Sequence, residues 1–148
     1  LDKIVERYPG TLTYLDFDEM LKNPEIDVVS ICLPSAMHAE FAVRAMEAGK
    51  HVLVEKPIDI TVDAAMKIEE ARVRTGKIAG VIHQNRNNAV MKPIKQALDS
   101  GRLGKLILGT FAVKWYRDQH YYEGWHGTWD MDGGGSLMNQ AVHTVDLM

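Results

Sequence analysis

Apolar and polar positions follow one another along the first half of the chain in blocks typical of a parallel α/β fold. Three short runs at residues 28–33, 51–55 and 77–83 are nearly continuous in apolar and β-branched side chains and predict strands. Runs of this kind indicate strands buried on both faces, as in a parallel sheet. Residues 38–48 and 61–75 carry apolar side chains at helical spacing. The alternation of strand and helix therefore predicts a doubly wound parallel sheet.

The ends of the helices carry their own signals. Asp16 with Glu19 predicts a capping box for a short helix at residues 17–22, and Leu15 with Met20 predicts its hydrophobic staple. Thr61 is placed as the N-cap of the helix that follows it. We expect a further helix at residues 90–100. Glycines that suit helix C-termini follow three of these helices, at Gly49, Gly76 and Gly101.

The pattern changes after Gly104. Residues 105–115 alternate, with Ile107, Phe111, Val113 and Trp115 on one face. A half-exposed strand of this kind is typical of an open antiparallel or mixed sheet, so we expect a second domain here. An aromatic, glycine-rich loop spans residues 116–135, and residues 136–148 read as one helix.

Composition narrows the class of protein. The chain has 148 residues, and its 17 Lys and Arg against 20 Asp and Glu give a net charge of −3. An apolar content of 46% excludes disordered and fibrous classes. The slightly negative charge offers no attraction to nucleic acid, and no apolar run approaches the ~20 residues of a membrane helix. A single cysteine, Cys32, cannot form an internal disulfide, so we expect a cytoplasmic protein.

Polar residues follow each predicted strand, where ligands bind in open parallel sheets. These groups are Pro34-Ser35, Glu55-Lys56-Pro57 and residues 84–86. Lys56 stands out because it follows an apolar run directly and must reach a ligand, an ion partner or solvent. Its position alone leaves open a solvated lysine paired with Glu55. A partly buried lysine can also have its pKa lowered and take part in proton transfer.

A second cluster follows a run of three glycines. A helix from Ser136 would bring Asn139, His143 and Asp146 near one face, and the glycines would let a ligand or another backbone approach. Spacing alone leaves His143 open between a core histidine and a catalyst. A triad with Ser136 is set aside because no G-x-S-x-G elbow is present.

Other histidines and aromatic residues add two further expectations. His120, His126 and His143 lack the spacing of metal ligands, so we expect no metal site. Aromatic side chains in the loop, Tyr121 and Trp129 among them, either cover the second sheet or line a pocket for a polyol.

Residues 48–57, AGKHVLVEKP, preceded by ICLP and HAE, resemble the glucose-fructose oxidoreductase/inositol dehydrogenase (Gfo/Idh/MocA) family. The sequence GGGSL at residues 133–137, followed by His143 and Asp146, resembles the second hallmark of that family. The QNR at residues 84–86 and the GRLG at residues 101–104 also match, so the resemblance extends over essentially the whole chain.

The resemblance implies the domain organisation. Residues 1–86 would be a partial dinucleotide-binding (Rossmann) domain without its first βαβ unit, because the G-x-G-x-x-G turn is not found. Residues 87–148 would begin a C-terminal α/β domain for substrate binding and oligomerisation, built on an open, mostly antiparallel or mixed sheet. We therefore expect a central fragment of a homo-oligomer, a dimer or tetramer, in which the residue that separates NAD from NADP is missing.

The resemblance also implies an activity: hydride transfer between NAD or NADP and a hydroxyl carbon of a sugar, cyclitol or sugar derivative. Lys56 would be the catalytic lysine and His143 the general acid/base. Asn139 stands where the family commonly has aspartate; it cannot take a proton and would orient substrate or Lys56. The small polyhydroxy substrate would contact Lys56, Tyr121, Trp129, Asn139 and His143. The cofactor would contact Leu33, Pro34, Ser35, His38, Glu55, Lys56 and Asn85.

Two alternatives remain at this point. One is a glycoside hydrolase of the same fold that uses NAD for transient oxidation; the lysine after Glu55 argues against it. The other is a catalytically silent dinucleotide-binding subunit, which only Asn139 supports. The resemblance further predicts a cis peptide bond between Lys56 and Pro57.

Overall fold

A computed structural model describes residues 1–148. Its centre is a three-stranded parallel sheet in the order β1-β2-β3, formed by β1 (Val28–Ile31), β2 (His51–Glu55) and β3 (Ala79–Ile82). Val29 pairs with Val52, and Val54 pairs with Val81. The predicted parallel α/β arrangement is confirmed.

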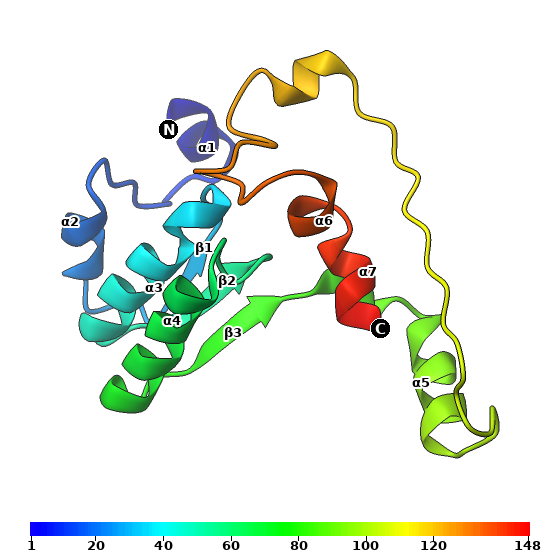
Figure 1. Ribbon diagram of the computed structural model, residues 1–148. Coiled ribbons are helices and arrows are strands. Elements are labelled where there is room, and N and C mark those ends of the chain that lie inside the picture. Colours follow the sequence, from blue (N-terminus) through cyan, green and yellow to red (C-terminus); the bar gives the residue numbers. More distant parts are fainter.

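Two helices cover one face of this sheet (Figure 1). They are α3 (His38–Glu47) and α4 (Val62–Thr75), which pack against each other as well as against the strands. Ala42, Ala45 and Ala71 are fully buried, and such small side chains let the helix backbones approach closely. The core on this face is made of apolar side chains from the strands and helices: Leu21, Val29, Ile31, Ala39, Ala42, Ala45, Met46, Val52, Val54, Ile68 and Ala71.

The opposite face of the sheet is open to solvent. Val28 is 56% exposed and Leu53 is 40% exposed, whereas their neighbours Val29 and Val54 are buried. Side chains alternate between the two faces of a strand, and both crossover helices lie on the same face. The prediction of strands buried on both faces was therefore wrong for this chain.

The helix ends confirm most of the local signals. In α2 (Phe17–Leu21), Asp16 Oδ1 accepts a hydrogen bond from the Glu19 backbone N–H at 2.9 Å, as an N-cap should. The reciprocal half of the capping box and the staple were wrong, because the Glu19 carboxylate pairs with Lys22 and Leu15 is 96% exposed. A short helix, α1 (Asp2–Arg7), precedes α2.

The same local signals hold at the other helices. Thr61 Oγ1 accepts from the Ala64 backbone N–H at 3.1 Å and caps α4. Gly76, which ends α4, has φ +68°, a conformation that glycine adopts without strain. The predicted helix after residue 90 is α5 (Met91–Asp99).

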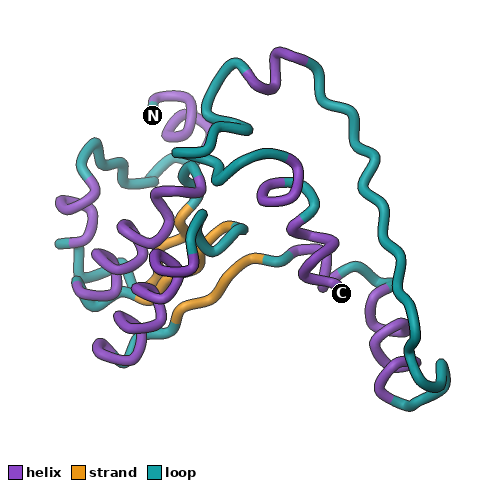
Figure 2. The backbone as a smooth tube through the Cα atoms, in the orientation of Figure 1, coloured by secondary structure: helices purple, strands orange, loops and turns teal.

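The chain after α5 runs away from the sheet and returns (Figures 1 and 2). Residues 105–118 are extended but pair with no other segment, and Ile107 and Leu108 are 92% and 84% exposed. A strand requires a hydrogen-bonded neighbour, and no other strand pairs with this segment. The predicted strand, and with it the antiparallel or mixed sheet, is not formed.

The expected single helix after the glycine run is two helices. These are α6 (Ser136–Asn139) and α7 (Val142–Leu147). The Ala141 backbone N–H donates to the Ser136 carbonyl five residues back, a wider turn than the α-helical one, and the helix is interrupted there. Short 3₁₀ turns complete the structure: η1 (Ser35–Met37), η2 (Gln84–Asn87) and η3 (Gln119–Tyr122). No helix combines the length and apolarity needed to span a bilayer.

Candidate active site

The site is built around Lys56, which follows β2 at the carboxyl end of the sheet. The Lys56–Pro57 peptide bond is cis, as predicted. The part-buried ammonium Nζ donates to the backbone carbonyl of Asn139 at 2.9 Å and faces the side-chain Oδ1 of Asn139 at 3.4 Å. Lysine and asparagine come from the two halves of the chain, so this contact joins them.

The surroundings of Lys56 lower its pKa. Burial is the main cause, because a charged ammonium loses solvation there. The negative charges of Glu55 and Asp132 oppose this effect and favour the ammonium form. The reading of Lys56 as a fully solvated lysine paired with Glu55 does not hold, because its Nζ binds Asn139.

Asn139 is held in turn by Asp132, a residue that the sequence analysis did not single out. Asn139 is 8% exposed and its Nδ2 donates to Asp132 Oδ1 at 2.6 Å. Asp132, 1% exposed, also accepts from the Gly127 backbone N–H at 2.7 Å and lies 3.4 Å from Ser35 Oγ. An aspartate inside a loop has no periodic pattern around it, and only its place beside the glycine run could have drawn attention to it.

His143 lies on α7 and is 6% exposed. Its pKa is lowered, first by burial and then by the positive charges of Lys56 and His83. Its Nδ1 is buried and makes no hydrogen bond. A neutral imidazole with a free nitrogen beside a lysine ammonium can accept a proton from a bound hydroxyl group.

Asp146 was expected on the same helix face as Asn139 and His143, but it pairs with Arg86 instead. Its carboxylate forms a two-pronged ion pair with Arg86, whose Nε lies 2.9 Å from Oδ2, and this hydrogen bond is the main reason that its pKa is lowered. His83, directly after β3, has its Nδ1 3.5 Å from Asp146 Oδ1. His83 was also missed, although it ends a predicted strand. The structure therefore brings Asn139 and His143 to Lys56 and turns Asp146 toward η2.

Side chains of the chain itself occupy the space beside the glycines of residues 133–135. A Cβ on Gly133, whose φ is +72°, would lie 2.9 Å from Ile60 Cβ, and one on Gly134 would lie 2.9 Å from the Trp129 ring. The close approach expected at these glycines is thus made by Ile60 and Trp129.

Residues expected at the cofactor line the same carboxyl edge. His38 is 1% exposed, and its two ring nitrogens lie 2.7 Å from the Pro57 carbonyl and 2.8 Å from the Leu33 carbonyl, so it ties β1 to the segment after β2. Ser35 is buried against Asp132. Three partly exposed residues remain beside them: Pro34, Glu55 and Asn85. Polar groups across the carboxyl ends of neighbouring parallel strands fit a dinucleotide, which crosses such an edge.

Of the two aromatic residues predicted to contact the substrate, Tyr121 lies at the site and Trp129 lies in another hollow. Tyr121 OH accepts from Gln140 Nε2 at 2.8 Å, and Gln140 follows Asn139, so Tyr121 is tied to the site. Trp129 is 82% exposed and lines a separate hollow of about 370 Å³ with the glycine run and α6. The structure does not bring Trp129 to Lys56.

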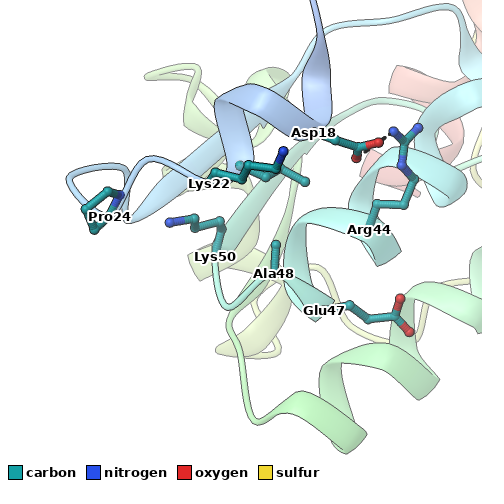
Figure 3. A pocket seen from close by; sticks show the side chains of 8 residues that line it. Asp18, Lys22, Pro24, Arg44, Glu47, Ala48 and Lys50 are labelled. Carbon is teal, nitrogen blue, oxygen red and sulfur yellow. Dashed lines mark hydrogen bonds and ion pairs between the residues drawn. The ribbon is translucent and has the colours of Figure 1, made fainter.

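Another hollow, of about 570 Å³, lies at the opposite edge of the sheet (Figure 3). It is lined by α2, α3 and Lys50, which immediately precedes β2. Its cations are engaged within the chain, since Arg44 pairs with Asp18 at 2.8 Å and Lys50 donates to the Asn23 carbonyl at 2.8 Å. A ligand there would be far from the strand ends that carry Lys56, so this hollow is not the candidate site.

Comparison with known proteins agrees with this geometry. Residues 2–83 match the model of an oxidoreductase family with an NAD-binding Rossmann fold, and residues 91–148 match a GFO/IDH/MocA C-terminal domain. A dehydrogenase of Comamonas testosteroni that acts on a 1-carboxy-3-chloro-3,4-dihydroxycyclohexadiene is 33% identical over 142 residues, which are 95% of this chain and 35% of the relative.

Two solved structures are also similar. The WlbA dehydrogenase of Bordetella pertussis, in complex with NADH and UDP-GlcNAcA, is 34% identical with a TM-score of 0.92, over 98% of this chain and 42% of that one. WlbA of Chromobacterium violaceum, with the same two ligands, is 36% identical with a TM-score of 0.94, over 100% and 43%. The chain thus spans less than half the length of these relatives. The matches confirm the predicted family and the NAD-binding domain: the chain belongs to the Gfo/Idh/MocA family of oxidoreductases.

Proposed function

We propose that the protein carrying this chain is an NAD(P)-dependent dehydrogenase that moves a hydride between the nicotinamide and a hydroxyl carbon of a sugar or related polyol. The observation that carries the proposal is the position of two groups at the carboxyl edge of an NAD-binding domain: a part-buried Lys56 that Asn139 holds, and a buried His143 whose pKa the charge of Lys56 helps to lower. Both side chains have lowered pKa values, as is common at catalytic sites.

The roles follow from the two environments. Neutral His143 accepts the proton of the substrate hydroxyl as the hydride leaves its carbon. Lys56 in its ammonium form donates to the same oxygen and stabilises the developing negative charge. In the reducing direction His143, once protonated, returns the proton. The nicotinamide, when bound, supplies or accepts the hydride, and the residues of the carboxyl edge, Pro34, Glu55 and Asn85, hold it against the substrate.

We propose further that the substrate is a nucleotide-linked sugar acid, of the kind that the WlbA structures contain as UDP-GlcNAcA. Arg117 supports a negatively charged substrate. Its guanidinium lies over Tyr121 at 5.2 Å and over Trp115 at 5.9 Å, and it donates to Gln140 Oε1 at 3.3 Å. It has no carboxylate partner in the chain, so it remains free to pair with a carboxylate or phosphate.

Asn139 does not argue for a silent subunit. Its carbonyl and side-chain oxygens bind the ammonium of Lys56, which is a positioning role that needs no proton transfer. The silent subunit and the NAD-dependent glycoside hydrolase both predict no net reduction of NAD by a free substrate, so turnover separates them from the dehydrogenase.

The test measures NADH formation at 340 nm by the full-length protein with NAD or NADP, using UDP-GlcNAcA and a panel of uncharged sugars and cyclitols. We expect turnover with the sugar acid and a loss of about 10²-fold or more in kcat for Lys56→Met. Lys67→Met, on the exposed side of α4, is the matched control and should keep wild-type rates. Absence of NAD(P) reduction with every substrate tested would contradict the proposed function. Equal rates with UDP-GlcNAcA and with the uncharged sugars would contradict the proposed substrate class.

A further inference from the structure

We propose that Asp132 is a positioning residue that orients the Asn139 side chain, and through it supplies the negative charge that keeps Lys56 in place as an ammonium. The catalytic consequence rests on the proposed function, whereas the effect on Lys56 itself does not. Asp132 comes from the loop after η3, far in sequence from the lysine that it serves.

The contacts of Asp132 identify it as a carboxylate. Its oxygens face the Gly127 backbone N–H, the Asn139 amide and the Ser35 hydroxyl, at 2.7, 2.6 and 3.4 Å. All of these groups can donate, and an ionised carboxyl group only accepts. At 1% exposure it has almost no contact with water, and no lysine or arginine binds it directly. A buried carboxylate of this kind needs a compensating positive charge nearby.

That charge is Lys56, on the other side of Asn139. Nδ2 of the amide donates to Asp132, while Oδ1 faces the Lys56 ammonium at 3.4 Å and accepts from Gln140 Nε2 at 3.2 Å. If the amide were turned over, its NH₂ group would point at an ammonium and its oxygen at a carboxylate. Asp132 therefore selects the amide orientation in which Lys56 finds an acceptor.

Asp132 also connects three segments of the chain. Ser35 follows β1, Gly127 lies in the aromatic loop, and Asn139 ends α6. The charged or titratable groups that act on Lys56 are Glu55, Asp132 and His143. Of the two carboxylates, only Asp132 also holds the lysine's hydrogen-bond partner, so its charge and its geometry act together on the ammonium.

The test removes the negative charge at residue 132 and then restores a negative charge at residue 139. Asp132→Asn keeps the size of the side chain but removes the charge and leaves the Asn139 amide free to turn. We expect about a tenfold or larger fall in kcat for substrate oxidation, with the KM for NAD changed by less than about twofold. Asn139→Asp in the Asp132→Asn background places a carboxylate directly beside Lys56 and should recover most of the loss. Asp130→Asn, an exposed aspartate two residues away, is the matched control.

A second readout needs no turnover. The reaction of Lys56 with an amine-directed reagent, followed by mass spectrometry over a pH series, reports its ionisation because only the neutral amine reacts. Its midpoint should move to lower pH in Asp132→Asn and return in the double variant. If Asp132→Asn does not fold, Asn139→Leu, which removes the same acceptor, should move the midpoint in the same direction.

The two proposals fail separately. A shifted labelling midpoint in a protein that oxidises no polyol would contradict the dehydrogenase and leave the role of Asp132 standing. An active enzyme in which Asp132→Asn, or Asn139→Leu in its place, leaves both the pH profile and the labelling midpoint unchanged would overturn the role of Asp132.

Discussion

Lys56 and His143 lie in one site, yet catalysis needs Lys56 charged and His143 neutral. The groups around each side chain favour that difference. Burial lowers both pKa values, but Glu55 and Asp132 counteract that effect at Lys56, while the Lys56 and His83 charges add to it at His143. An ammonium and a neutral imidazole can therefore exist side by side near neutral pH. Two neighbouring groups with separated pKa values are the pattern expected of an acid and a base acting on one substrate oxygen.

Removing the imidazole tests its assignment as the base. In the full-length protein we expect His143→Asn to lower kcat by roughly 10²–10⁴-fold, because a positioned general base contributes about that much. The affinity for NADH, measured by fluorescence titration, should change little, since the dinucleotide is expected on the first domain. His120→Asn, at a side chain 87% exposed, is the control. Near wild-type turnover in His143→Asn would make this residue a core histidine.

The pH dependence has a defined direction. The folded pKa of His143 is below its ordinary value of 6.5, so kcat/KM for alcohol oxidation should fall as pH drops through that lowered pKa and the imidazole becomes charged.

The same shift affects stability. On acidification His143 binds a proton in the unfolded chain before it does so in the folded one, so stability falls as pH drops below about 6.5. Urea denaturation at pH 7.5 and 5.5 measures this, and the contribution should vanish in His143→Asn. An unchanged difference in that variant would assign the effect to other groups.

Local signals correctly place the start of α2 and both ends of α4. Asp16 and Thr61 accept from backbone N–H groups in the first turns of α2 and α4, and Gly76 ends α4 with a positive φ. These features depend on residues within one turn of the helix end, so sequence alone predicts them. The break between α6 and α7 carries no glycine or proline, and nothing local announces it.

The cap of α4 should have a measurable effect on stability. Thr61→Ala removes the acceptor for the Ala64 backbone N–H and should lower the free energy of unfolding by about 1 kcal/mol in urea denaturation. Thr61→Ser retains the hydroxyl group and should lose only a fraction of that. Equal stability of the alanine and serine variants would show that water satisfies the first turn as well as Thr61 does.

The molecule as a whole leaves much apolar surface open. One face of the sheet exposes Val28 and Leu53, and the extended segment at residues 105–118 exposes unpaired backbone together with Ile107 and Leu108. Unpaired extended backbone with apolar side chains is a template for pairing with another chain.

We therefore expect the 148-residue chain to associate with itself. Light scattering should give a mass above the 16.6 kDa of one chain, rising with concentration. Ile107→Lys together with Leu108→Lys, at side chains that are 92% and 84% exposed, should reduce the mass, because charge on an extended edge opposes pairing. Lys67→Met is a control outside this surface. A monodisperse monomer at high concentration would contradict the expectation.

The amino-acid sequence by itself determined the parallel α/β arrangement, the helix caps, the placement of Lys56 at a strand end and the family. Each depends on a short pattern: apolar runs, residues one turn apart, or the AGKHVLVEKP motif. Only the tertiary structure decided which chemical groups meet. Lys56 and Asn139 are 83 residues apart, and Asp132, Arg117 and Trp129 lie in irregular segments without periodicity. Contacts of that kind depend on how the whole chain folds back on the sheet, because a local sequence pattern does not specify which distant segments come together.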